Sequence, residues 1–180
     1  MGWFEALGFK PRQLGSGTAS ATVRRIAAEL DALDADRARY LAGFAYLLGR
    51  VAHADHDIGG EETAAMEGLL QRVGHLPEDQ AVLVVQIAKA QNELFGGTEN
   101  FLVSRELKRV VRPEELRALL DALFAVAAAD GAISGEEESQ IRQIASELGL
   151  SHGDLVASRA AWSAHRSVLR SLRGDDPSSG

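Results

Sequence analysis

The sequence contains no cysteine. This absence excludes disulfide bonds, thiolate zinc sites and iron–sulfur clusters. No apolar run approaches the roughly 20 residues that a bilayer-spanning helix needs. Residues 1–20 also lack the basic start, apolar core and small-residue cleavage site of a secretory signal. We therefore expect a cytoplasmic protein without a transmembrane segment.

Positive charge is also scarce, since the net charge is −7 at pH 7 and the isoelectric point is about 5.2. A nucleic-acid interface needs clustered Lys and Arg to neutralise phosphates, so we expect no nucleic-acid partner. Catalytic signatures are missing: there is no P-loop, no G-x-S-x-G and no Glu followed three residues later by His, as di-iron bundles need. These absences predict a protein that is not an enzyme.

Apolar residues at helical spacing are plentiful from residue 22 onward. They predict an all-α fold, a single-domain helical bundle of about seven or eight helices over residues 21–173. Residues 1–20 are expected to be a flexible amino-terminal segment, and residues 174–180 a disordered tail. The segment 81–95 is apolar on most sides, which favours a central buried helix. The main stripes contain Val23, Ile26 and Leu30, then Leu41, Phe44, Leu48 and Val51, and later Leu116, Leu119, Leu123 and Val126.

Glycine and proline positions predict several helix ends. Gly74 and Gly149 are placed to end helices, because glycine readily adopts the left-handed conformation found there. Pro77 and Pro113 suit a first helical position, where the missing N–H is not needed. Ser151 is a plausible cap for the last helix.

A nine-residue acidic segment occurs twice, as ADHDIGGEE at residues 54–62 and ADGAISGEE at residues 129–137, 75 positions apart. The same shift of 75 residues also aligns apolar positions in the flanking helices with one another. This agreement predicts a duplicated helix–loop–helix unit with an internal pseudo-twofold repeat. The superposed pairs are Leu48 and Leu123, Val51 and Val126, Met66 and Ile141, and Leu69 and Ile144.

Some of the loop carboxylates have a purely structural interpretation. Ser134 followed by Glu137 is a capping box, in which side chains satisfy backbone N–H groups of the first helical turn. Gly59 with Glu62 is a weaker version. Glu61 and Glu136 would gain from the positive end of a helix dipole.

Asp55 and Asp130 are harder to explain structurally, because each falls where a helix should end and carbonyls should be exposed. Either loop N–H groups compensate the carboxylate in an Asx-type turn, or a divalent cation does. Neither loop is an EF-hand, since the twelfth positions are Met66 and Ile141 rather than Glu. The candidate metal ligands are Asp55, Asp57, Glu61 and Glu62 in the first loop and Asp130, Glu136 and Glu137 in the second.

The identity of a cation is left open among Ca²⁺, Mg²⁺, Mn²⁺ and Zn²⁺. In the first loop His53, His56 and Asp57 would share one helical face, which also makes a zinc or nickel site geometrically feasible. A solvated histidine cluster is the simpler alternative.

Charge is distributed unevenly along the chain. Residues 53–79 are strongly acidic, whereas residues 155–173 contain arginines and no acid. Opposed patches of this kind suit a homo-oligomer or docking to a charged protein partner, although solvated faces are the commoner explanation. Trp3 and Phe4 belong to an amino-terminal apolar cluster that is either a loosely packed terminus or a small amphipathic anchor.

The duplicated acidic loop resembles that of the TerB family of tellurite-resistance proteins, whose domain is related to the amino-terminal domain of the DnaJ-like co-chaperone DjlA. The resemblance covers roughly Tyr40 to Trp162. It is carried by Asp55, Ile58, Glu61 and Glu62 in the first loop, and by Asp130, Gly131, Ile133, Ser134, Glu136 and Glu137 in the second.

The resemblance implies a cytoplasmic protein of seven or more helices with pseudo-twofold symmetry. It also implies a link to tellurite and other chemical stress, often beside membrane-associated partners, and an acidic metal site. The candidate ligands carried over are Asp55, Glu61, Glu62, Asp130, Glu136 and Glu137. His56 and Asp57 stand where the second loop has Gly131 and Ala132, so the two loops need not be equivalent.

Two hypotheses follow. In the first, the protein is a non-enzymatic stress-response protein that binds a divalent metal ion through both acidic loops and bridges to a membrane-associated complex. In the second, it is a metal-independent interaction module whose acidic surface docks to a basic or membrane-associated partner.

Overall fold

The computed structural model describes residues 21–52, 60–90, 100–129 and 132–173, and of Glu61, residues 100–101 and residues 164–173 it gives the backbone alone. The predicted terminal segments 1–20 and 174–180 lie outside this part of the chain. The described residues form helices and no strand, which confirms the all-α prediction. The helices are α2 (Ala21–Asp31), α3 (Ala35–Ala52), α4 (Gly60–Arg72), α5 (Glu78–Lys89), α7 (Asn100–Val110), α8 (Pro113–Ala127), α9 (Gly135–Glu147) and α10 (His152–Arg173).

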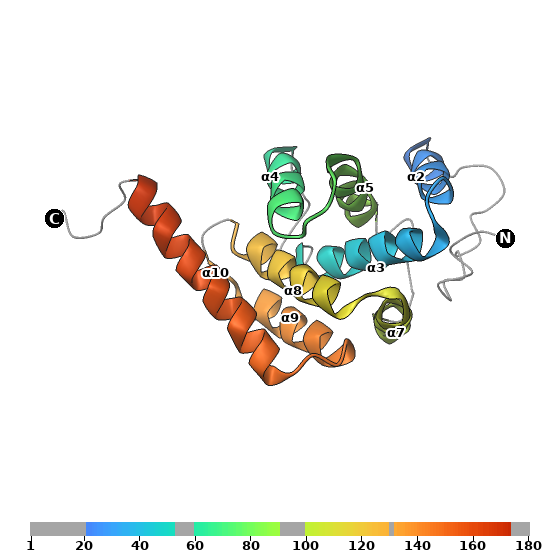
Figure 1. The fold of residues 1–180 in the computed structure, drawn as a ribbon. Coiled ribbons are helices and arrows are strands. Elements are labelled where there is room, and N and C mark those ends of the chain that lie inside the picture. The colour runs from blue at the N-terminus through green and yellow to red at the C-terminus, as the bar shows by residue number, and fades with distance from the viewer. Residues whose placement is uncertain (1–20, 53–59, 91–99, 130–131, 174–180) are drawn as a thin grey trace.

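Helices α3 and α8 form the centre of the bundle and pack against each other. α3 also packs against α2, α5, α7 and α9, and α8 against α4, α9 and α10. In Figure 1, α2, α4 and α5 lie on one side of this central pair, and α7, α9 and α10 lie on the other. Helix α10 crosses the bundle beside α8 and continues beyond it.

The core explains why α3 and α8 are central. Both are apolar around most of their circumference, as expected of helices that have neighbours on several sides. Phe44 of α3 and Phe124 of α8 are among the largest side chains that are almost completely buried. The helix predicted at 81–95 corresponds to α5, whose buried face includes Val84 and Ile87, but it lies on one side of the central pair rather than at the centre (Figure 1). α5 ends at Lys89, and residues 91–95 lie outside the described chain.

A glycine brings α3 and α7 close together. A Cβ atom built on Gly43 would lie 3.0 Å from Cδ1 of Leu107, which is fully buried. This is tighter than ordinary van der Waals contact, so a larger residue would crowd the Leu107 side chain at this close approach of α3 and α7.

Most helix ends follow the sequence pattern. Pro113 is the first residue of α8 and Gly149 follows α9 with φ 74°, both as predicted. Ser151 caps α10, since its Oγ accepts a hydrogen bond from the Asp154 N–H at 3.1 Å. Pro77 was predicted to be the first helical residue, but it is the N-cap of α5, which begins one position later at Glu78.

The end of α4 differs from expectation. The residue with positive φ is His75 (φ 55°), not Gly74. Gly74 is needed for a different reason: a Cβ atom there would lie 2.7 Å from the carbonyl oxygen of Leu70. The Leu76 N–H donates to that same carbonyl at 3.2 Å, so the chain turns tightly around the last turn of α4.

Helix bounds follow the spacing of the two acidic segments. Shifting α4 by 75 residues reproduces both ends of α9, and the same shift carries the end of α3, Ala52, onto the end of α8, Ala127. The helix contacts follow the same relation: α3 packs against α9, and its counterpart α8 packs against α4, the counterpart of α9. The pseudo-twofold symmetry itself stays a prediction.

Candidate functional site

The two acidic loops connect α3 to α4 and α8 to α9. In Figure 1, α3 and α8 both run away from the α2 and α7 side of the bundle, so their loop-bearing ends point toward the side where α10 extends. Asp55, Asp57 and Asp130 lie outside the described residues, as do His53 and His56. The described part of the site therefore consists of the helix starts that receive the loops.

Glu137 forms the capping box that its sequence position predicts. The Glu137 N–H donates to Ser134 Oγ at 3.1 Å, and the Ser134 N–H donates to Glu137 Oε2 at 2.8 Å. The Glu137 side chain is buried, with 8% of the residue exposed. One carboxylate oxygen is thus engaged by the start of α9, which confirms the structural interpretation for this residue.

The remaining described loop carboxylates face solvent. Glu62 in the first turn of α4 and Glu136 in the first turn of α9 are exposed. Both lie where the helix dipole favours negative charge. Among the described residues no group of three or more metal-ligating side chains comes together.

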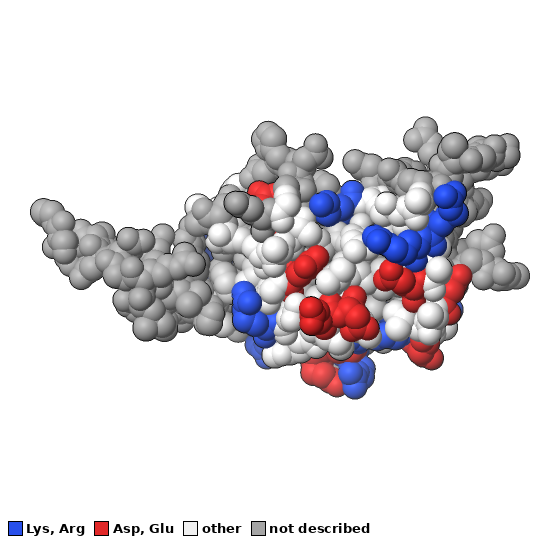
Figure 2. All heavy atoms as spheres, turned by 90° about the horizontal axis from the view of Figure 1, so that it is seen from above, with Lys and Arg blue, Asp and Glu red and all other residues white. Residues whose placement is uncertain are grey.

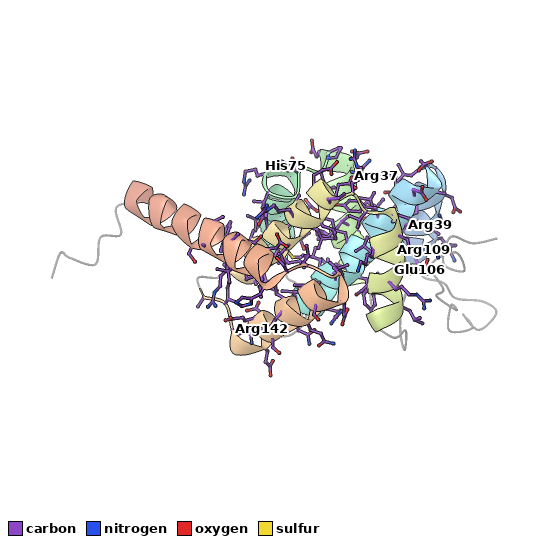
Figure 3. All side chains as sticks on the ribbon, turned by 60° about the horizontal axis from the view of Figure 1, so that its bottom comes forward. Arg37, Arg39, His75, Glu106, Arg109 and Arg142 are labelled. Atoms are coloured by element: carbon purple, nitrogen blue, oxygen red, sulfur yellow. The ribbon has the colours of Figure 1, made fainter. Side chains whose placement is uncertain are left out.

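Glu138 is a further carboxylate at the start of α9 that the loop motif did not include. Its Oε1 atom lies 2.9 Å from Nη1 of Arg159 on α10 and 3.2 Å from Nη2 of Arg142. Arg142 lies on the exposed side of α9 (Figure 3). Glu138 therefore joins α9 to the first half of α10 through partly exposed ion pairs.

A buried polar cluster near the end of α3 was missed by sequence reasoning. Its centre is Glu147, the last residue of α9, whose side chain is 12% exposed. Nη1 of Arg50 lies 2.9 Å from Glu147 Oε2, and the Arg50 side chain is only 5% exposed. Ser104 of α7 donates to the same oxygen, and Gln143 donates to Oε1 at 3.0 Å. The one signal in the sequence is Arg50 itself, the charged residue in the otherwise uncharged stretch of α3 from Tyr40 to Ala52.

Opposing effects act on the pKa of Glu147. Burial by itself raises this pKa, but hydrogen bonds from Arg50, Ser104 and Gln143 and the charge of Arg50 lower it, and the net shift is downward. Burial is also the main reason why the pKa of the nearby Tyr46 is raised. The carboxylate of Glu147 is thus held in its charged form.

A second polar cluster lies at the opposite end of α3. Glu115 of α8 accepts hydrogen bonds from Arg112 at 2.9 Å and from Arg37 of α3 at 3.4 Å. The hydrogen bond from the Arg112 side chain is the main reason why the pKa of Glu115 is lowered. Arg37 also donates to Gln80 of α5 and lies 5.0 Å from the ring centre of Tyr40 (Figure 3). Burial, followed by the charge of Glu115, raises the pKa of Tyr40 to about 12.

Charges of both signs lie on one face of the described chain. In Figure 2, Lys and Arg side chains lie beside Asp and Glu side chains over the described part of the face seen from above. Ion pairs within one helix include Arg39 with Asp36 and Arg109 with Glu106. Arg39 belongs to α3 and Arg109 to the neighbouring α7 (Figure 3). Exposed pairs of this kind contribute little to stability.

None of the helices in the described chain combines the length and apolarity that crossing a membrane requires.

The fold and the acidic helix starts define a class of small all-helical proteins in which acidic loops join successive helices. Residues 40–160 match the family model described as tellurite resistance protein TerB, and this match covers about two thirds of the 180 residues. The chain therefore belongs to the TerB family. No curated protein and no solved structure matches the chain significantly.

Proposed function

We propose that this TerB-family protein is a non-enzymatic stress-response protein that binds a divalent metal ion through its two acidic loops. The observation that carries the proposal is that the acidic segment recurs along the sequence and that the helix bounds follow the same spacing. The two acidic segments lie 75 residues apart, and α4 and α9 begin and end at positions related by the same shift. Capping alone requires Ser134 and Glu137, and it gives no reason for an aspartate at the start of each loop.

The candidate ligands are Asp55, Asp57, Glu61 and Glu62 in the first loop and Asp130, Glu136 and Glu137 in the second. Carboxylate oxygens suit Ca²⁺, Mg²⁺ and Mn²⁺, and Zn²⁺ also accepts them. Glu62 and Glu136 are exposed at helix starts, where a cation can reach them. Glu137 is committed to the cap through Oε2, so it would contribute Oε1.

The alternative proposal is a metal-independent interaction module in the cytoplasm, docking to a basic or membrane-associated partner. The engagement of Glu137 by the capping box and of Glu138 by two arginines favours it. In this case the loop carboxylates serve helix starts and an acidic surface, and partner binding would weaken at high salt.

Isothermal titration calorimetry with Ca²⁺, Mg²⁺, Mn²⁺ and Zn²⁺ separates the two proposals. The first predicts binding of at least one ion by the wild type and its loss in the Asp55→Ala plus Asp130→Ala variant. A matched control is Glu29→Ala plus Glu114→Ala, which removes two exposed carboxylates far from the loops in sequence. The control should bind like the wild type, because it leaves the candidate ligands intact. Both variants change the net charge by the same amount, so a difference between them is not an effect of overall charge.

Absence of heat with all four ions rejects ion binding. An equal loss of affinity in the control variant would show that bulk charge, rather than the loops, attracts the ion. The alternative is tested with an oligolysine peptide: it predicts binding that high salt abolishes and EDTA leaves intact, and chelator-sensitive binding contradicts it.

A further inference from the structure

The buried carboxylate of Glu147 accepts hydrogen bonds from side chains of three helices. Arg50 of α3 binds both of its oxygens, with Nη1 2.9 Å from Oε2 and Nη2 3.3 Å from Oε1. Ser104 of α7 donates to Oε2, and Gln143 of α9 donates to Oε1. A two-pronged arginine–carboxylate contact fixes orientation as well as distance. One carboxylate therefore sets how the end of α3, the middle of α7 and the end of α9 meet.

Few alternatives are available to Arg50 if this carboxylate is lost. Its Nη2 atom has a second acceptor, Gln140 Oε1 at 3.3 Å, and its buried Nε atom has no hydrogen-bond partner in the described chain. Breaking a buried ion pair from one side leaves an uncompensated charge, which is far less favourable than replacing both partners by apolar residues. The Arg50 guanidinium would then have to move toward water, and the end of α3 would move with it.

The position of Arg50 links this cluster to the candidate site. Arg50 lies two residues before Ala52, where α3 ends, and the first acidic segment begins at Ala54. α9, on which Gln140, Gln143 and Glu147 lie, is the helix that follows the second acidic segment. The contact thus fixes the helix that enters one acidic loop against the helix that leaves the other.

We infer that Glu147 is a positioning residue, which through Arg50 holds the end of α3, the helix that precedes the first acidic segment, against α9. Neutralising Glu147 releases the end of α3 and α7 while the rest of the bundle stays folded. The consequence for ion affinity rests on the proposed function, whereas the local release does not.

The matched control is Glu115, which has the same chemistry at the other end of α3. It binds Arg37 of α3 and Arg112, and its side chain is 18% exposed, close to the 12% of Glu147. Glu147→Gln and Glu115→Gln each keep the size of the side chain and remove one charge. A general loss of stability would affect both variants alike, whereas positioning by Glu147 affects only the end of α3 that leads to the first loop.

The experiment is hydrogen exchange followed by mass spectrometry on the full chain at neutral pH. In Glu147→Gln we expect exchange about tenfold faster or more in residues 46–52 and 102–107, with α5 unchanged, because a buried charge loses its partner. In Glu115→Gln the faster exchange should appear at residues 35–40 instead. Unchanged exchange in residues 46–52 of Glu147→Gln, or the same increase in Glu115→Gln, overturns the inference.

Acid provides a test that needs no variant. The groups that act on the pKa of Glu147 are Arg50 of α3, Ser104 of α7 and Gln143 of α9, and Tyr46 of α3 also interacts with its charge; of these four only Arg50 is charged in neutral or acidic solution. Because the pKa of Glu147 is lowered by folding, the contact should persist down to the usual glutamate range and open below it. The protection factor of residues 46–52, which corrects for the slower intrinsic exchange in acid, should then fall in the wild type on acidification and stay constant in an Arg50→Met plus Glu147→Leu variant. Equal acid sensitivity of the two proteins contradicts the inference.

Titration with Mn²⁺ then tests the link to the loops. Weaker Mn²⁺ binding in Glu147→Gln than in Glu115→Gln supports positioning of the first loop, and equal affinities overturn that link. If the wild type binds no Mn²⁺ or other divalent ion, the proposed function fails, while the exchange experiment still decides whether Glu147 holds the end of α3.

Discussion

The capping box at the start of α9 allows a quantitative prediction about the second acidic loop. Ser134→Ala removes the side-chain oxygen that accepts the Glu137 N–H, a contact of 3.1 Å. Loss of an N-cap of this type costs about 1 kcal/mol. Glu137→Ala removes the acceptor of the Ser134 N–H, and an unpaired buried donor costs about 1–3 kcal/mol. Glu137→Gln keeps an acceptor oxygen and should cost less than about 1 kcal/mol, mainly through the lost interaction of its charge with the helix dipole.

Thermal and urea unfolding measure these differences. For a chain of this size, 1 kcal/mol corresponds to about 2–4 °C in Tm. Ser151→Ala is the matched control, since Ser151 accepts the Asp154 N–H at 3.1 Å at the start of α10 in the same way. We expect the two serine variants to lose similar stability. If Ser134→Ala and Glu137→Ala both unfold within about 1 °C of the wild type, the capping explanation of the second loop is refuted.

Three further predictions concern the core and its ionisable groups. Gly43→Ala should destabilise the protein by about 1 kcal/mol in urea unfolding, because crowding of Leu107 outweighs the gain in helix propensity; equal or greater stability would contradict the close approach of α3 and α7. Folding lowers the pKa of Glu115 and Glu147, so their contribution to stability is present above the usual glutamate pKa and is lost as pH falls through the pKa of the folded state. In a variant with Gln at both positions, the free energy of unfolding should therefore fall less steeply with acid than in the wild type. The same dependence on pH in both proteins would refute this. Burial raises the pKa of Tyr40 to about 12, so its hydroxyl should stay protonated at pH 11, as an ultraviolet titration compared with Tyr40→Phe would show. The contribution of this group to stability should be lost as pH rises toward 12. Ionisation of Tyr40 near pH 10 would contradict this prediction.

Local chemistry explains which features could be predicted from the sequence. Periodic apolar residues place α2, α3 and α8 because a helix must bury one face or more. The Ser134 cap, the Pro113 start and the Gly149 end follow from backbone needs within a few residues. Interactions of this range are visible in sequence without knowledge of the fold.

Features that depend on distant residues could not be predicted in this way. Glu147 and Arg50 are 97 positions apart, and nothing in either neighbourhood indicates that they meet. At the end of α4 the pattern placed the left-handed residue at Gly74, but His75 adopts it, because Gly74 must pass close to the Leu70 carbonyl. Packing thus decides which of two adjacent residues adopts the left-handed conformation, although local preference alone would favour the glycine.

The loop aspartates and the metal site remain predictions, and the most direct test locates the ion in solution. Nuclear magnetic resonance with substoichiometric Mn²⁺ should selectively broaden the amide signals of residues that flank the two loops, because paramagnetic broadening falls steeply with distance. The reporters are Ala52, Gly60, Ala129 and Ala132. We predict broadening of these signals in the wild type and its loss in the Asp55→Ala plus Asp130→Ala variant. Uniform broadening, or broadening that persists in the variant, would contradict ion binding by the duplicated loops.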